Sequence, residues 1–256
     1  GNLAQVRTII GSDPQALAIA LAAPVGIETI PVYPVDNFGS QMTPLYTALA
    51  LWVGSVLMIV ALRSDVTAEN VADGLEETHP TALYFKGREV KLWEGFLGRY
   101  LIFGLIALIQ ATILCLGELF FLKVQHAHPW EFMCAGWFMA FVFSFLLYTF
   151  IATFGNAGKA LGVLFLVLQI SASGGAFPLD ILPSFFRSIS PYLPATHGIT
   201  ALRASIAGYA GNEYLDAMLL LGAFALFAVV LGLGIRPFLI KNNRLLVEKL
   251  ESTKLM

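Results

Sequence analysis

The chain has 256 residues, of which 57% are hydrophobic and only 12% are charged, and its formal net charge is −2. A typical soluble domain carries about 25% charged residues, so this chain lacks the polar groups that a water-facing surface needs. The composition predicts an all-α membrane protein and excludes an ordinary soluble enzyme. The nearly balanced charge gives no reason to expect a nucleic-acid partner.

Residues 1–42 are rich in turn formers and precede the first long apolar run. Ser12 and Asp13 can cap a short helix, with Pro14 in its first turn. That helix, predicted over 15–23, is too short to cross a bilayer, which requires about 20 apolar residues. We expect 1–42 to be an extracellular juxtamembrane segment, the end of an extracellular domain that lies upstream of this chain.

Five apolar runs follow and predict five membrane spans. They form a transmembrane domain over 43–236, and a basic cytoplasmic tail follows over 237–256. The charged loop after the first span ends at 90–97, which is either a helix in the membrane interface or the polar start of the second span. The predicted spans are 43–62, 100–122, 132–154, 159–172 and 217–235.

The basic residues orient these spans, because cytoplasmic loops carry an excess of Lys and Arg. With the N-terminus of the chain outside, eleven Lys and Arg residues lie on the inner side and four on the outer side. We therefore expect a multi-pass protein of the cell membrane with an extracellular N-terminus and a cytoplasmic C-terminus. The outer four are Arg7, Lys123, Arg187 and Arg203. No signal pattern precedes the first span, so either the start was processed or an upstream part belongs before it. The outside N-terminus favours an upstream span, which gives a parent protein of six spans.

The apolar pattern breaks after the fourth span. Gly174 and Gly175 allow tight backbone turns there, and several prolines forbid a continuous helix. Irregular backbone at membrane depth persists only where protein or a water-filled cavity supplies hydrogen-bond partners. A re-entrant helical hairpin over 173–195 fits this pattern, with aromatic residues such as Phe177 at the interface. The alternative is a structured extracellular loop. The prolines are Pro178, Pro183, Pro191 and Pro194.

This broken stretch also carries a family resemblance. The sequence over 168–183 is LQISASGGAFPLDILP, and it is followed by Pro194 and by Ala-Leu-Arg ending at Arg203. These residues resemble the signature of ABC-2-type membrane domains. The segment PVDNFGSQMTP over 34–44, followed by LALWVG over 49–54, resembles more specifically the YhgE/Pip (phage infection protein) family. The resemblance covers most of the chain, from about Asp13 to Arg236.

The resemblance implies a plan of one N-terminal span, a large extracellular domain and five further spans. Some proteins of this family serve as bacteriophage attachment factors on Gram-positive cells, and others accompany type VII secretion systems. The resemblance further implies a homodimer in the lipid bilayer. It makes a separate ATPase subunit or secretion-system proteins candidate partners, and it places phage contacts in the extracellular domain that this chain lacks.

Three polar residues lie inside the predicted spans: Gln110, Glu118 and Gln169. An ionisable or amide side chain at membrane depth is a candidate functional site. Glu118 is close enough to Lys123 and to the interface that extension toward water is the favoured interpretation. Gln169 either contacts substrate or forms a hydrogen bond with a neighbouring helix. Arg203 is a candidate counter-charge for Glu118 or for Asp180.

Other patterns point to packing instead of chemistry. His126 and His128, with Glu131 and Cys134, lack the i, i+4 spacing of common zinc sites, so we expect no metal. No P-loop motif and no nucleophile–base set is present, so we expect neither catalytic residues nor a cofactor. Cys115 and Cys134 are both expected to be buried. Gly158 and Gly162 form a small-xxx-small pair, which favours close helix packing.

Two functions follow from these observations. The leading hypothesis is an ABC-2-like membrane domain in export or in assembly of the cell envelope. The alternative is a non-transporting anchor for an extracellular domain that serves as a phage receptor or as a type VII secretion accessory.

Overall fold

The computed structural model describes residues 33–62, 92–235 and 238. The helix expected at 15–23, most of the charged loop, and the C-terminal tail lie outside the described residues. The chain divides into two compact units, Gly1–Pro34 and Val35–Met256. Only Tyr33 and Pro34 of the first unit are described, so the following account concerns the second unit.

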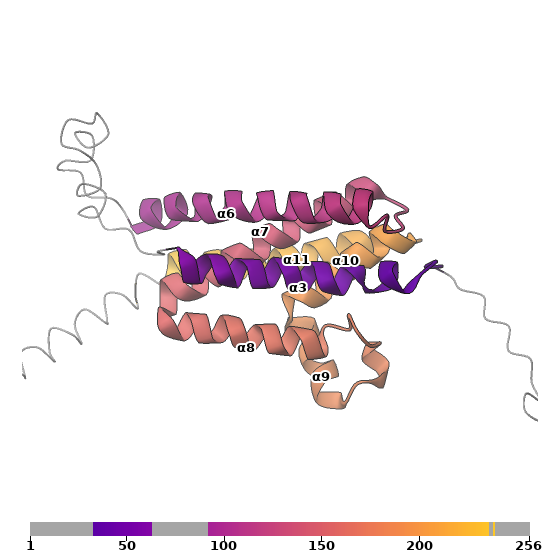
Figure 1. Ribbon diagram of the computed structural model, residues 1–256. Helices are drawn as coiled ribbons and strands as arrows, with labels where there is room; N and C mark the ends of the chain where they lie inside the picture. The colour runs from indigo at the N-terminus through magenta and orange to yellow at the C-terminus, as the bar shows by residue number, and fades with distance from the viewer. Residues whose placement is uncertain (1–32, 63–91, 236–237, 239–256) are drawn as a thin grey trace, which may run out of the picture. The chain divides into compact units, whose positions relative to one another are not determined.

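All regular structure in the described residues is helical, as the composition predicts. Figure 1 shows the long helices α3, α6, α7 and α11 side by side, with α8 along one side of the group. α6 and α11 each end in a π-helix, η1 and η4 respectively. The bounds are α3 Phe38–Ala61, α6 Leu92–Leu116, η1 Gly117–Phe121, α7 Pro129–Phe154, α8 Asn156–Ala172, α11 Glu213–Val229 and η4 Val230–Ile235.

Local sequence explains where these helices begin. Asn37 caps α3, because its Oδ1 accepts a hydrogen bond from the Ser40 N–H at 2.8 Å. Pro129 occupies the first turn of α7, where a missing N–H is tolerated. Between α7 and α8 the chain turns at Gly155, whose φ of +59° suits glycine better than any other residue.

Four helices of the described chain are long and apolar enough to cross a membrane: α3, α6 with η1, α7, and α11 with η4. They correspond to four of the five predicted spans. The remaining prediction, 159–172, corresponds to α8, which has 17 residues and a length of about 25 Å. This is short of the hydrocarbon thickness of about 30 Å, so the fifth crossing remains a prediction.

The described part of the interfacial segment at 90–97 belongs to α6. Leu92 begins that helix, and the residues from Trp93 continue it without a break. From Leu92 onward, this segment is therefore the polar start of the second span and not a separate interfacial helix. Val90 lies outside the described residues.

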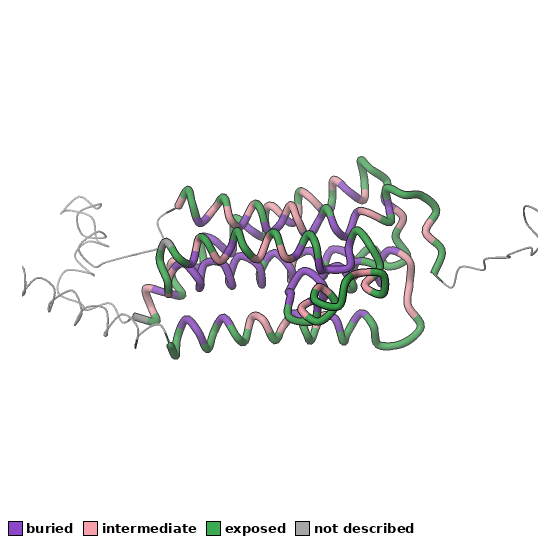
Figure 2. The backbone as a smooth tube through the Cα atoms, turned by 90° about the horizontal axis from the view of Figure 1, so that it is seen from below, coloured by how far each residue is buried: buried purple, intermediate pink, exposed green. Residues whose placement is uncertain are grey.

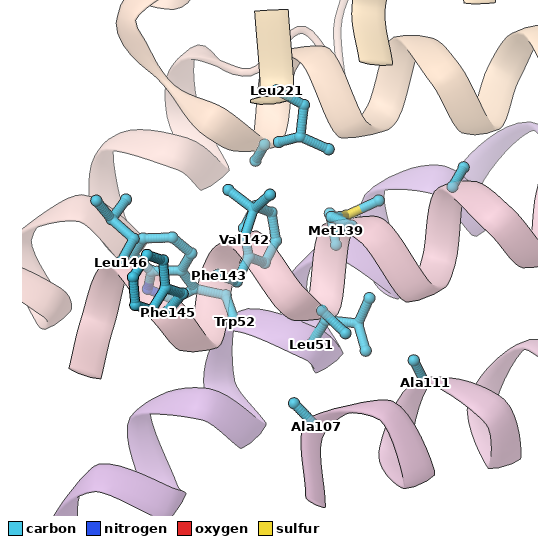
Figure 3. Close-up of a cluster of buried hydrophobic side chains, with 14 of the residues drawn as sticks. Leu51, Trp52, Ala107, Ala111, Met139, Val142, Phe143, Phe145, Leu146 and Leu221 are labelled. Carbon is cyan, nitrogen blue, oxygen red and sulfur yellow. The ribbon is translucent and has the colours of Figure 1, made fainter. Parts of the chain in front are cut away.

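α7 is the central helix of the bundle, and Figure 2 shows that its buried stretch is almost continuous. The Trp52 ring of α3 contacts the Phe143 ring edge to face, with 5.0 Å between centroids. Figure 3 shows side chains of α3, α6 and α11 converging on α7. Edge-to-face aromatic pairs and interlocking apolar side chains therefore fix the positions of the spans.

The outer faces of the bundle are apolar. Leu101, Leu105 and Ile113 of α6 are exposed, as are Leu219 and Leu226 of α11. Exposed apolar side chains at so many positions fit lipid rather than water.

The prediction that both cysteines are buried is correct for Cys115 and wrong for Cys134, which is exposed on α7.

Candidate functional site

The break between α8 and α11 consists of short helices that turn the chain back toward the bundle. After α8 come η2 (Leu179–Ile181), α9 (Ser184–Ile189), η3 (Ser190–Tyr192) and α10 (Pro194–Ala207). Figure 1 shows α9 beyond the end of α8, with the chain returning into α10. Pro183 precedes α9 and Pro194 begins α10, so these two prolines stand where a new helix starts.

Both glycines of the break are required by their surroundings. Gly174 has a φ of +71°, in the left-handed region that other residues rarely adopt. A Cβ atom on Gly175 would lie 2.6 Å from Leu45 Cδ1 and 3.1 Å from Ile199 Cδ1. The backbone at Gly175 therefore lies against α3 and α10 with no space for a side chain.

Two side-chain hydrogen bonds hold the returning chain. The Arg203 Nη2 donates to the Gly175 carbonyl at 2.8 Å, which ties α10 to the loop after α8. The Gln169 Oε1 accepts the Ala195 N–H at 3.1 Å and so satisfies a free donor at the start of α10. Arg203 thus serves a backbone carbonyl rather than either proposed carboxylate, and Gln169 bonds a neighbouring helix.

Three aromatic residues of the break face outward. Phe177, Phe185 and Tyr192 are exposed, and Phe177 is followed by the exposed Pro178. By contrast, α10 is almost wholly buried from Pro194 to Ile199. The returning helix therefore packs inside the bundle, whereas the turn that precedes it presents aromatic rings to its surroundings.

A second polar contact joins α3 to the end of α6. Glu118 lies in the π-helix η1 and is only 5% exposed. Its Oε1 lies 2.6 Å from Thr47 Oγ1 on α3. The interpretation that Glu118 extends to water is wrong, because the side chain is directed at a neighbouring helix instead. π-helical turns occur frequently at functional sites, so Glu118 in η1 stays a candidate site residue.

An apolar groove of about 750 Å³ lies between α3 and η1 beside this contact. Glu118, Tyr46 and Phe121 are among its lining residues. Further along the same helix pair, the Gln110 Nε2 donates to the Ala50 carbonyl at 2.9 Å. Gln110 also fills the space above Gly54, where any Cβ atom would collide with it. Gln110 and Glu118 therefore both act at the α3–α6 contact, whereas Gln169 belongs to the break.

The histidine-containing loop forms no metal site among the described residues. The His126 ring bonds the Val124 carbonyl, and the His128 ring packs near Tyr209. The Tyr209 hydroxyl donates to Glu131 Oε1 at 2.9 Å. This hydrogen bond raises the pKa of Tyr209 above its usual value, and burial and the nearby Glu131 and Glu213 carboxylates act in the same direction.

The small-residue pair on α8 is used within this chain. The carbonyl of Gly162 accepts the Trp52 Nε1–H at 3.1 Å, and a Cβ atom there would lie 2.7 Å from Leu147 Cδ2. A Cβ atom on Gly158 would lie 2.2 Å from the Phe150 carbonyl oxygen. Both glycines therefore allow α8 to approach α7 closely, which agrees with the predicted role of this pair in helix packing.

Sequence reasoning missed Thr47 and the π-helix. Thr43 and Thr47 are four residues apart on α3, and both are buried. Two hydroxyl residues at helical spacing within an apolar run are the signal that a polar contact crosses that face. No sequence pattern indicated that the i→i+4 ladder would widen at Gly117.

Comparison with known proteins agrees with this architecture. The family model described as "ABC-2 family transporter protein" matches residues 2–233. The chain belongs to the ABC-2 family. Its membrane domain is also 28% identical over 236 residues to the "Uncharacterized protein YhgE" of Bacillus subtilis (strain 168).

That alignment covers 92% of this ABC-2 chain and 28% of the relative, so the chain spans little more than a quarter of the relative's length. No solved structure matches it. The resemblance to YhgE-type proteins is confirmed, and the chain is a multi-pass, permease-type membrane domain.

Proposed function

We propose that this ABC-2 domain is the membrane part of an export or envelope-assembly system and works with a separate ATPase subunit. The observation that carries the proposal is the family match over residues 2–233, which includes the whole described bundle and the break. The helical bundle around α7 supplies a rigid scaffold, and the break supplies polar backbone within it. Such backbone is tolerated at membrane depth where it lines a path or is buried in protein.

The proposed arrangement has five spans and a re-entrant hairpin, with 1–42 outside and 237–256 in the cytoplasm. α8 is the short fourth span, and the turn at α9 with the start of α10 completes the hairpin. The exposed rings of Phe177, Phe185 and Tyr192 are suited to the membrane interface. The assembled protein is proposed to be a homodimer, and its upstream span and extracellular domain belong to the longer parent protein.

The orientation can be tested with a membrane-impermeant maleimide on cells. In a background in which Cys115 and Cys134 are replaced by alanine, Ser184→Cys is expected to react from outside because Ser184 is exposed in α9. Ala157→Cys, at the opposite end of α8, is expected to react only after the cells are permeabilised. The reverse pattern would contradict the proposed orientation.

The ATPase partner can be tested through the basic residues of the cytoplasmic segment. Changing Lys86, Arg88 and Lys91 together to glutamate is expected to abolish co-purification with ATPases encoded near the parent gene, and to abolish export. The matched control reverses Lys249 and Lys254 in the tail. Normal association and export in the first variant would count against an ATPase that docks there.

A non-transporting anchor is the second candidate. Among the described residues, Glu118 is the only carboxylate, lysine or arginine whose side chain is buried, so few charges line a path through the bundle. In this role the domain holds an extracellular domain that phage use as a receptor or that assists type VII secretion. Reconstituted parent protein that neither stimulates any candidate ATPase nor moves substrate, yet still supports phage adsorption, would favour the anchor.

A further inference from the structure

We infer that Glu118 is a proton-binding site: its carboxyl group holds a proton while α3 and α6 are in contact, and release of that proton loosens the contact. The inference goes beyond the proposed function, because it holds for a transporter and for an anchor alike. It rests on the number of hydrogen-bond donors available to the oxygen atoms between α3 and η1.

The argument begins with Thr47. Its Oγ1 lies 2.8 Å from the Thr43 carbonyl and 2.6 Å from Glu118 Oε1. A threonine hydroxyl has one hydrogen to donate and two lone pairs to accept with. Thr47 can therefore donate to only one of these two oxygens, although both lie at hydrogen-bond distance.

An ionised Glu118 leaves one contact without a hydrogen. If Thr47 donates to the carboxylate, the Thr47 Oγ1 and the Thr43 carbonyl oxygen lie 2.8 Å apart with no hydrogen between them. If Thr47 donates to the carbonyl, the same conflict arises at 2.6 Å with Glu118. A protonated Glu118 removes the conflict, because Glu118 donates to Thr47 and Thr47 donates to Thr43.

The second carboxyl oxygen of Glu118 also favours the protonated form. Glu118 Oε2 is buried and has no hydrogen-bond partner among the described residues. A charged oxygen in this position would be strongly disfavoured, whereas the carbonyl oxygen of a neutral acid is disfavoured far less. Leu49, Ile113 and Leu114 beside it are apolar, and the Tyr46 phenol, which also lines the groove, forms no hydrogen bond with this oxygen.

The titratable and charged groups nearby do not change this account. On α6 the Cys115 thiol lies close to Glu118, and on α3 the Tyr46 phenol lines the same groove. Lys123 and His126, after η1, are exposed. Glu131 of α7 accepts from Tyr209, and Arg203 of α10 donates to Gly175. These side chains are exposed, already bonded elsewhere, or carry no positive charge that would offset an ionised Glu118.

Loss of the proton changes the contact between the helices. A carboxylate at this position needs several donors or a cation, and the structure provides one shared hydroxyl. The ionised side chain is therefore expected to leave Thr47 and move toward the polar interface at the end of η1, where Lys123 is exposed. This movement separates η1 from the first half of α3, so the contact responds to pH.

The first experiment detects the proton directly. Infrared spectra of the full chain in lipid nanodiscs, recorded at about pH 6, where exposed carboxyl groups are ionised, are expected to contain the carbonyl band of a protonated acid. Glu118→Gln should remove this band, while Glu213→Gln, which changes an exposed carboxylate at the start of α11, should leave it. Identical bands in wild type and Glu118→Gln would overturn the proposal.

The second experiment measures its consequence. If the folded state binds one proton more than the unfolded chain, stability is greatest at acidic pH and falls as pH rises, by up to about ten-fold per pH unit in the unfolding constant. Thermal unfolding of wild type and Glu213→Gln should show this decline, and Glu118→Gln should lack that part of it. Equal pH dependence in wild type and Glu118→Gln would overturn the inference.

A further variant tests the hydrogen-bond chain itself. Thr47→Val removes the hydroxyl but keeps the β-branched shape, and it should shift the acid band because the acceptor is lost. Thr200→Val on α10 removes a hydroxyl that also bonds its i−4 carbonyl, and it should leave the band unchanged. An unshifted band in Thr47→Val would exclude Thr47 as the partner of Glu118.

Discussion

The core around α7 and the break between α8 and α11 are held together in different ways. In the most apolar stretch of α7, 78% of residues are buried, and its neighbours contact it through aromatic and aliphatic side chains. In the break, the decisive contacts are the hydrogen bond that Gln169 accepts from the Ala195 N–H, the one that Arg203 donates to the Gly175 carbonyl, and the close approach of Gly175. One region depends on side-chain volume, and the other depends on the backbone.

This difference has a physical origin in the membrane setting. Lipid tails are as apolar as leucine side chains, so close packing rather than hydrophobic transfer holds helices together. A helix satisfies its own N–H and C=O groups, so the shapes of its side chains then decide how it packs against other helices. Where the helix stops, each free backbone group needs a partner, and the side chains of Gln169 and Arg203 supply two of them.

The largest expected effect is in the core. Phe143→Ala removes a fully buried ring that packs on Trp52, and it should destabilise the fold by about 3 kcal/mol. Unfolding in detergent micelles would measure the loss. Phe120→Ala, at an exposed position of η1, is the control and should change little. Equal losses in both variants would contradict the dependence on packing around α7.

A smaller effect is expected at Gly175. Gly175→Val places a side chain between Leu45 and Ile199, and the overpacking should cost about 2 kcal/mol. Gly98→Val, at a helical glycine with open space around it, controls for the added bulk. The same unfolding measurement distinguishes them. A tolerated Gly175→Val would mean that the loop can move away from α3.

The next effect concerns Gly174, where the cause is conformation. Gly174→Ala adds a Cβ atom at a φ of +71° and 2.9 Å from Leu179 Cγ, and it should cost about 1–2 kcal/mol. Gly117→Ala, in η1 with open space around it, should be neutral or slightly stabilising. If both variants behave alike, the left-handed turn is not needed.

The smallest effect is expected from the hydrogen bond to the break. Arg203→Met removes the donor to the Gly175 carbonyl but keeps most of the side-chain length, and it should cost about 1 kcal/mol. Arg203→Lys should recover part of this loss. Faster amide hydrogen exchange confined to the loop after α8 would locate the effect. A loss as large as that of Phe143→Ala would erase the distinction between the two regions.

The sequence predicted the long helices well because long apolar runs have few alternatives in a membrane. The runs at 43–62, 100–122 and 132–154 fall within α3, α6 with η1, and α7, apart from one residue at the ends of the first two. It also located the break, because paired glycines and repeated prolines disfavour one continuous helix through that stretch. It could not assign partners to Arg203 or Glu118, because these partners come from segments distant in sequence.

The amino-acid sequence by itself determined that this protein is a helical membrane domain, where its helices run and where they are interrupted. Those properties follow from apolar length and from the backbone limits of glycine and proline. Only the tertiary structure decided that α7 is central, that Gly175 lies against α3, and that Glu118 is buried against Thr47. These depend on which helix faces are brought together, and equally apolar helices do not encode that choice in their hydropathy.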